Sequence, residues 1–129
     1  MMDQHNDSSL FVNKDAIWVG RFQPLTVGHL ISLFIILSKY KRCWIGIVYY
    51  SPKPDNMAPE WRSYIESAES ILKDLTRNPF TTEEVVRMWN AVLSECELVN
   101  RVELIPMTRV AYQPDFDEKY PPDKFDFVD

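Results

Sequence analysis

The sequence predicts an α/β fold with a doubly wound parallel sheet, and three observations support that prediction. A short apolar run without polar alternation, residues 16–19, precedes a long apolar segment, and a second apolar run follows at 43–50. Strand, helix and strand in so short a stretch make a βαβ unit, which requires parallel strands and a right-handed crossover. Further strand-like runs at 101–107 and 124–129 follow helical or loop segments, so the sheet is expected to continue.

The composition is typical of one soluble globular domain. The chain has 129 residues, of which 46% are hydrophobic, and a net charge of -5. An acidic balance argues against a general nucleic-acid surface. Cys43 and Cys96 each lie in an apolar stretch, which predicts buried free thiols and a reducing, cytoplasmic location. The polar opening residues are no signal peptide, so residues 1–13 are expected to be a flexible tail and 14–129 the domain.

The first half of the domain is expected to run from strand to helix to strand. Residues 16–19 form a strand covered on both faces, and residues 20–28 form the loop that follows it. A helix begins at Gly28 or His29 and ends near Tyr40. Its apolar stretch is far shorter than the ~20 residues that span a bilayer, so we expect a buried helix and no membrane contact.

The second half is expected to add two helices and two strands. Residues 59–75 carry apolar side chains on one stripe of a helix that proline opens. Thr81 or Thr82 caps the next helix, which ends near Cys96, and Thr81 with Glu84 fits a capping box. A strand at 101–107, a long aromatic and acidic loop, and a strand beginning at 124–129 complete the order.

The loop after the first strand has the composition of an anion site. In such sheets, ligands sit beyond the carboxyl ends of the strands, next to the turns that lead into helices. Gly20 permits close backbone approach and Gly28 relieves crowding at the helix start, where free N–H groups attract phosphate. His29 adds a donor and Arg21 a full charge. Either side chain alone has an ordinary alternative, a histidine bonded to a carbonyl or a solvated arginine, but their combination favours a phosphate site.

Two stretches resemble one superfamily. Residues 20–29, "GRFQPLTVGH", resemble the first motif of nucleotidyltransferases with the HIGH signature, and the Arg-Phe-Gln-Pro form is most similar to archaeal-type nicotinamide mononucleotide adenylyltransferases. Residues 77–84, "RNPFTTEE", are similar to a second segment of that branch. The resemblance covers about residues 17–107 and implies a Rossmann-like fold of the nucleotidyltransferase type. Thr26 replaces the first histidine, Val85 replaces an arginine, and residues 55–76 contain an extra helix after the second strand.

The resemblance also implies a reaction and a set of site residues. A phosphate of the acceptor would attack the α-phosphorus of a nucleoside triphosphate such as ATP, and pyrophosphate would leave with Mg²⁺. His29 and Thr26 would stabilise the transition state, and no protein side chain is expected to bind a metal. The residues expected to bind the nucleotide and its phosphates are Gly20, Arg21, Phe22, Gln23 and Gly28, and those expected to bind the acceptor are Arg77, Asn78, Tyr49, Tyr50 and Ser51.

Several alternatives remain open from the sequence. The acceptor is expected to be a mononucleotide, with cytidylyl-type or pantetheine-type acceptors and a non-catalytic nucleotide-binding subunit as the other readings. Aromatic side chains on the loops could stack on a ligand ring, although packing is the simpler interpretation of any one of them: Tyr49, Tyr50, Tyr112, Phe116 and Tyr120.

The similar family continues past its fourth strand into an Ile-Ser-Ser/Thr-x-x-Arg motif, which residues 1–129 do not contain. We therefore expect the chain by itself to be nearly inactive, to bind triphosphate weakly, and to self-associate or pair with a completing chain through its C-terminal strand. A shortened chain, a split subunit and a binding protein are the three explanations for the missing motif.

Overall fold

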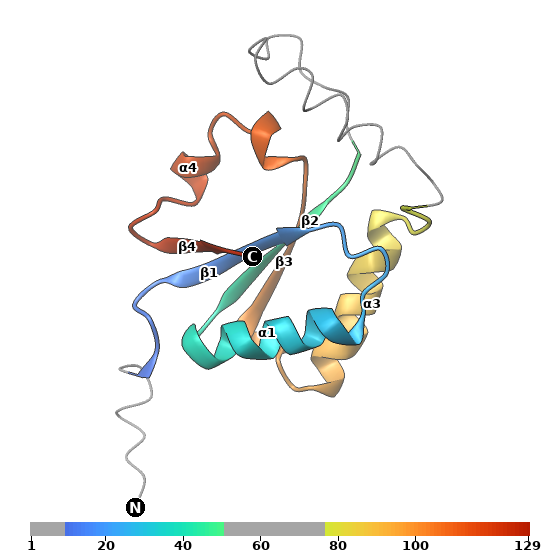
Figure 1. Cartoon of the computed structure of the whole chain (residues 1–129), viewed down its shortest axis with the longest axis horizontal. Helices are drawn as coiled ribbons and strands as arrows, with labels where there is room; N and C mark the ends of the chain where they lie inside the picture. Colours follow the sequence, from blue (N-terminus) through green and yellow to red (C-terminus); the bar gives the residue numbers. More distant parts are fainter. Residues whose placement is uncertain (1–9, 51–76) are drawn as a thin grey trace, which may run out of the picture.

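Four parallel strands form the centre of the molecule in the computed structural model, which describes residues 10–50 and 77–129 (Figure 1). They are β1 (Asp15–Gly20), β2 (Cys43–Val48), β3 (Val102–Met107) and β4 (Phe125–Val128), in the order β3-β2-β1-β4. Each neighbouring pair is parallel. The predicted parallel α/β sheet is therefore confirmed, whereas the helix predicted at 59–75 lies outside the described residues.

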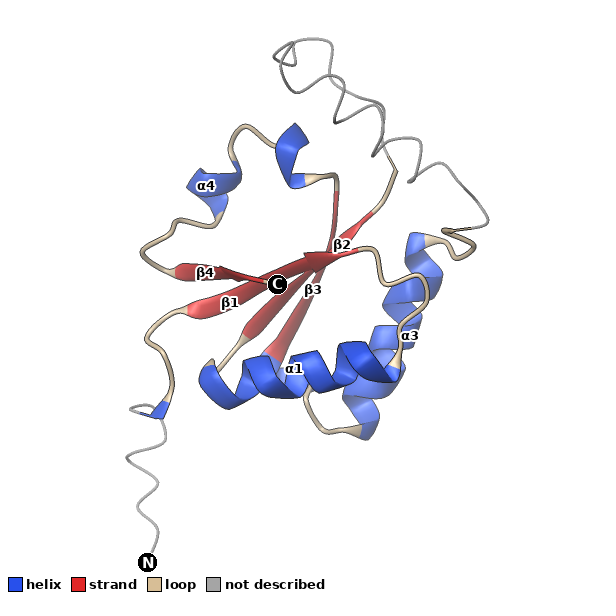
Figure 2. Ribbon diagram, viewed as in Figure 1, coloured by secondary structure: helices blue, strands red, loops and turns tan. Residues whose placement is uncertain are grey.

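Helices cover both faces of the sheet (Figure 2). On one face lie α1 (Val27–Lys39) and α3 (Thr82–Glu95), and on the other lie the 3₁₀ turn η4 (Val110–Tyr112) and α4 (Phe116–Lys119). A further 3₁₀ turn, η3 (Val99–Arg101), leads into β3. This arrangement confirms the doubly wound prediction and corrects the expectation of an irregular loop between the last two strands. Helices as short as η4 and α4 carry no readable periodicity.

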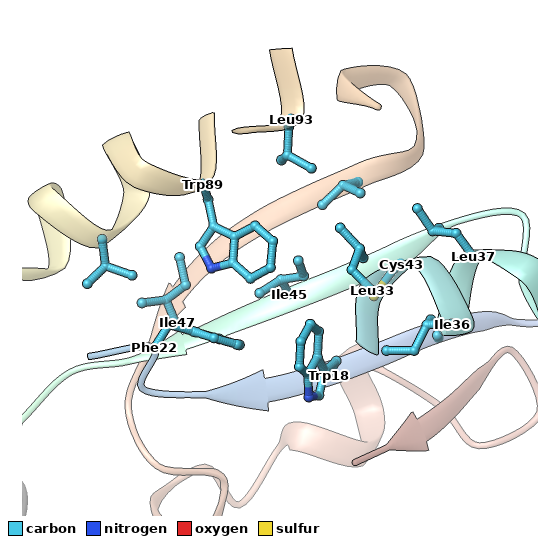
Figure 3. Close-up of a cluster of buried hydrophobic side chains, with 13 residues drawn as sticks. Trp18, Phe22, Leu33, Ile36, Leu37, Cys43, Ile45, Ile47, Trp89 and Leu93 are labelled. Atoms are coloured by element: carbon cyan, nitrogen blue, oxygen red, sulfur yellow. The ribbon is translucent and has the colours of Figure 1, made fainter. Parts of the chain in front are cut away.

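The main core fills the space between the sheet and helices α1 and α3 (Figure 3). β1 and β2 contribute inward side chains such as Trp18 and Ile45, while α1 contributes Leu33 and α3 contributes Trp89. Trp89 is 0% exposed, as its place on the apolar stripe of α3 predicts. The sheet and both helices are thus held by one apolar layer.

The other face has a smaller, aromatic core. Ile17 and Met107 point from the sheet toward Phe116, which is buried on α4. Tyr120 contacts both Phe116 and Phe125, with ring centroids 5.0 and 5.4 Å apart. Phe116 and Tyr120 therefore pack within the fold and do not form a stacking platform at the ligand edge.

Contacts at the C-terminal end of α1 tie the start of the described chain to the fold. The Val12 amide donates to the Lys39 carbonyl (2.8 Å), so the backbone is attached to the fold before residue 14. Arg101 donates to the carbonyls of Leu37 (2.7 Å) and Tyr40 (3.0 Å). Carbonyls at the end of a helix have no partner within the helix, so Arg101 supplies one. None of the described helices is long and apolar enough to cross a membrane.

The two cysteines differ in environment. Cys43 is fully buried at the start of β2, as predicted. Cys96 is exposed, so the prediction of a buried thiol is wrong there. It occupies the C-cap of α3, one residue beyond the helix, where the apolar stripe has already ended.

Candidate functional site

The loop between β1 and α1 lies at the carboxyl edge of the sheet. β1 pairs with β2 on one side and with β4 on the other. The chain leaves β1 toward β2, and the later connection from β3 to β4 passes to the opposite side of β1. The loop therefore begins next to the point where strand order reverses, which is where open α/β sheets bind ligands.

Phe22 gives this loop its shape. Its backbone has a positive φ of 53°, an uncommon conformation for a bulky residue. The ring folds back into the main core, where only 4% of the residue is exposed. A Cβ added at Gly20 would lie 3.0 Å from Cζ of that ring, so Gly20 makes room for Phe22. Any contact of Phe22 with a nucleotide would thus come from its backbone.

Thr26 and His29 form a reciprocal cap at the start of α1. The Thr26 hydroxyl accepts from the His29 amide (3.4 Å), and the Thr26 amide donates to Nδ1 of His29 (3.0 Å). Because a backbone N–H can only donate, Nδ1 is the acceptor and the proton of the neutral imidazole sits on Nε2. The sequence does not predict this cap, because histidine takes the position where glutamate or glutamine usually stands.

The surroundings of His29 favour its neutral form. The imidazole and the Phe22 ring form a T-shaped pair with centroids 5.0 Å apart, and the centroid of the Trp18 ring lies 6.2 Å from that of the imidazole. Partial burial against these rings lowers the pKa of His29 below its ordinary value. No acidic residue occupies the first turn of α1, so the positive potential of its N-terminus is not cancelled there. The result is a helix start with a neutral N–H donor.

Two side chains of the loop reach the segment that precedes α3. Nη1 of Arg21 donates to Oδ1 of Asn78 (2.8 Å). The Gln23 carboxamide pairs with the backbone of Phe80 in both directions: Nε2 donates to the carbonyl (2.9 Å) and Oε1 accepts from the amide (2.9 Å). We call the Gln23–Phe80 pair, together with Arg21–Asn78, the clasp. It joins the two stretches that carry the sequence resemblance.

A pocket of about 230 Å³ lies beside the clasp. It opens between the end of β2 and the start of α3. Among the predicted acceptor residues, Tyr49, Tyr50 and Asn78 line it. The full lining is Gln23, Val48, Tyr49, Tyr50, Asn78, Pro79, Phe80, Thr81 and Thr82.

Other predicted residues lie apart from this pocket. Thr26 and His29 do not line it, and Arg77 is an exposed residue at the start of the second described segment. Ser51 lies outside the described residues. A Cβ added at Gly28 would meet only Oγ1 of Thr26, at an ordinary 3.6 Å, so crowding does not explain this glycine. Within 10–50 and 77–129, no three acidic, histidine or cysteine side chains gather as a metal site.

Sequence reasoning missed two supports of the site. Phe80 binds Gln23 through its backbone, and any residue has the same backbone groups, so the residue type at position 80 does not reveal this contact. Trp89 belongs to the core, but it also supports the loop, since its ring contacts Phe22 with centroids 5.2 Å apart. Neither contact has a local sequence signal, because each joins residues distant along the chain.

Comparison with known proteins identifies relatives of this chain, although no family model matches it. It is 30% identical over 99 residues to a nicotinamide-nucleotide adenylyltransferase of Thermococcus onnurineus, covering 77% of this chain and 42% of that protein. It is 31% identical over 100 residues to the enzyme of the same name from Thermococcus kodakarensis, covering 77% and 43%. The chain thus spans less than half the length of the curated relatives it matches.

A solved structure confirms the fold. The structure is that of a bifunctional NMN adenylyltransferase/ADP ribose pyrophosphatase from Francisella tularensis, complexed with AMP and an Mn ion. The match has a TM-score of 0.55 at 18% identity and covers 92% of this chain and 37% of that one. Together these findings show a distant similarity to archaeal nicotinamide mononucleotide adenylyltransferases and a fold of the nucleotidyltransferase superfamily, as the sequence motifs predicted.

Proposed function

We propose that this chain takes part in nucleotidyl transfer, moving an adenylyl group from ATP to a mononucleotide such as nicotinamide mononucleotide. One observation carries the proposal. The loop that resembles the first nucleotidyltransferase motif ends in a helix N-terminus with a neutral His29 donor, and the clasp joins that loop to a pocket. The similarity to archaeal adenylyltransferases supports the same reaction class.

The phosphates of ATP are proposed to bind at α1 and not at α3. α3 carries Glu83 and Glu84 in its first turn, whereas the first turn of α1 has no acidic residue. Phosphate is stabilised by free N–H groups and by the positive end of a helix, and nearby carboxylates oppose it. The Nε2–H of His29, the Thr26 hydroxyl and the remaining donors of Arg21 would face the triphosphate, with the backbone of the 20–28 loop around it.

The reaction itself needs positioning more than acid–base chemistry. A phosphate oxygen of the acceptor forms a bond to the α-phosphorus, the bond to the bridging oxygen of the β-phosphate breaks, and pyrophosphate leaves with that electron pair. Donors that are fixed before the reaction stabilise the charge that develops on these oxygens. A neutral imidazole held by its own cap is such a donor.

A divalent cation is proposed to enter with the triphosphate as part of the substrate. Mg²⁺ is commonly held by substrate phosphates with only one or two carboxylates. The described residues offer no set of three metal-ligating side chains. The protein residues would then act on the phosphates, and we assign none of them to the metal.

Turnover of a His29 variant tests the catalytic assignment. His29→Ala should lower pyrophosphate release about 100-fold while weakening ATP binding only modestly, because the lost donor acts mainly on the transition state. Pyrophosphate release and isothermal titration with ATP measure the two effects. Lys39→Ala, an exposed change in the last turn of the same helix, should leave both values unchanged. Wild-type activity that survives His29→Ala would remove the catalytic role.

The acceptor side is tested separately. Arg77, which belongs to the second resembling stretch, is proposed to bind the phosphate of the acceptor. Arg77→Gln should then raise the KM for the mononucleotide more than the KM for ATP. Equal changes in both values would show that Arg77 does not distinguish the two substrates.

Two other functions are separated by the same measurements. Pyrophosphate release with a cytidylyl-type or pantetheine-type acceptor, but not with a mononucleotide, would keep the reaction and change the substrate. Nucleotide binding without pyrophosphate release, at any acceptor concentration, would indicate a non-catalytic binding subunit.

A further inference from the structure

Gln23 is placed by the sequence resemblance among the nucleotide-binding residues, but its side chain has other partners. Its Nε2 and Oε1 atoms both bind the Phe80 backbone at 2.9 Å, across 57 residues of chain. Two opposed N–H···O bonds between an amide and a peptide group resemble the pairing of neighbouring strands, and they fix both distance and orientation. The side chain is directed at the loop before α3 and not at open solvent.

The position of this pair matters because Phe80 stands at the entrance to α3. The adjacent residue, Thr81, is the N-cap of that helix, and its hydroxyl accepts from the Glu84 amide at 3.1 Å. Gln23 therefore holds a backbone whose next residue is already fixed by the helix. Residues 78–82 form one side of the pocket, and Gln23 lines the same pocket.

A third hydrogen bond lies beside this pair. Arg21, two residues before Gln23, donates to Asn78, two residues before Phe80. The two segments are thus joined twice at matching spacing. Hydrogen bonds at two separate points resist both sliding and rotation of one loop against the other, which attachment at a single point does less well.

From this geometry we infer that Gln23 is a positioning residue, which sets the wall of the acceptor pocket by gripping the backbone of Phe80. The identity of the pocket as an acceptor site rests on the proposed function. The grip, meaning the two hydrogen bonds between Gln23 and the Phe80 backbone, does not rest on that function, because it is a contact within the chain. Loss of the grip frees residues 78–82 without unfolding the sheet, and the mononucleotide loses affinity while ATP, bound at α1, does not.

Amide hydrogen exchange tests the grip without any ligand. In Gln23→Ala the Phe80 amide loses its acceptor, so its exchange should accelerate about tenfold or more, as expected for one lost hydrogen bond. The amides of β1 should keep their wild-type rates. Gln113 offers a matched control, since it is also a half-buried glutamine bound to a backbone carbonyl, that of Thr108 at 2.8 Å. Gln113→Ala should leave the Phe80 rate unchanged.

A conservative variant separates the two bonds. Gln23→Glu keeps an oxygen for the Phe80 amide but places a second oxygen against the Phe80 carbonyl. The Phe80 amide should then stay partly protected from exchange, while the bond to the Phe80 carbonyl is lost. An unchanged Phe80 rate in Gln23→Ala, or an equal acceleration in Gln113→Ala, overturns the inference.

Titration with nicotinamide mononucleotide and with ATP completes the test. The Kd for the mononucleotide should rise about tenfold in Gln23→Ala, and the Kd for ATP should change less than about twofold. Equal losses for both ligands overturn the positioning role. A wild-type chain that binds neither ligand contradicts the proposed function, and the exchange rates then still decide whether Gln23 grips Phe80.

Discussion

His29 both caps a helix and serves as a proposed donor, and the cap requires its neutral form. Its Nδ1 accepts from the Thr26 amide, and a protonated Nδ1 can no longer accept. The pKa of His29 is lowered by burial. A group whose pKa is lower in the folded state stabilises the fold fully above its unfolded value of about 6.5, and this contribution disappears as pH falls through the folded pKa.

We therefore expect unfolding free energy to fall more steeply between pH 7.5 and 5 for the wild type than for His29→Asn, which cannot titrate. Denaturant unfolding at each pH measures this difference. An NMR titration of the imidazole, assigned by its absence in His29→Asn, should give a pKa below the ordinary value. A pKa at or above that value would contradict the packing around His29.

The two thiols should differ in reactivity. Burial raises the pKa of the Cys43 thiol to about 12, and the nearby Asp15 carboxylate contributes. Cys96 is exposed. Because the thiolate is the reactive form, a disulfide reagent should modify one thiol quickly in the native protein and the second only after unfolding. Cys96→Ser should abolish the fast phase. Two fast thiols would mean that the start of β2 opens readily.

At the scale of elements, the cap of α3 is open to direct measurement. The Thr81 hydroxyl accepts from the Glu84 amide, and the Glu84 carboxylate accepts from the Thr81 amide at 2.8 Å. That bond to the backbone lowers the pKa of Glu84. Thr81→Ala should cost about 1 kcal/mol of unfolding free energy, whereas Thr81→Ser, which keeps the hydroxyl, should cost much less. Urea unfolding measures both variants. Equal losses of unfolding free energy in Thr81→Ala and Thr81→Ser would assign the effect to the methyl group.

The elements that were predicted well are those with local signals. The strands at β1 and β3 and the helix α3 follow from apolar runs and from the Thr81–Glu84 cap, which lie within a few residues of one another. The Rossmann-like fold was implied by the family resemblance, and the βαβ pattern predicted that the first two strands are parallel. The inward turn of Phe22 and the Gln23–Phe80 pair had no such signal, because their partners are brought close only by the folded sheet.

For the whole molecule, β4 is the strand expected to mediate association. It pairs with β1, and no strand in the described part of the chain pairs with its other edge. Phe127 on β4 is 55% exposed. An open edge with an exposed aromatic residue is a template for another strand. We expect self-association through this edge, which light scattering measures directly.

Two variants at positions of nearly equal exposure locate that contact. Phe127→Lys should shift the protein toward the monomer by placing a charge at the edge. Ile31 on the outer side of α1 is 53% exposed and provides the matched control, so Ile31→Lys should leave the mass unchanged. If Ile31→Lys dissociates the protein and Phe127→Lys does not, the apolar outer side of α1 is the interface. A wild-type monomer would refute association altogether.

The strand order has a consequence for how the chain is made. β1 and β2 come first in the sequence and lie in the middle of the sheet, while β3 and β4 come last and lie at its two sides. A nascent chain that has emerged only as far as β2 therefore presents two strands with open edges. The free edge of β2 is paired once β3 has emerged, and the free edge of β1 is paired only later, when β4 has emerged. The four-stranded sheet can therefore be complete only once β4 has emerged, well after the two central strands.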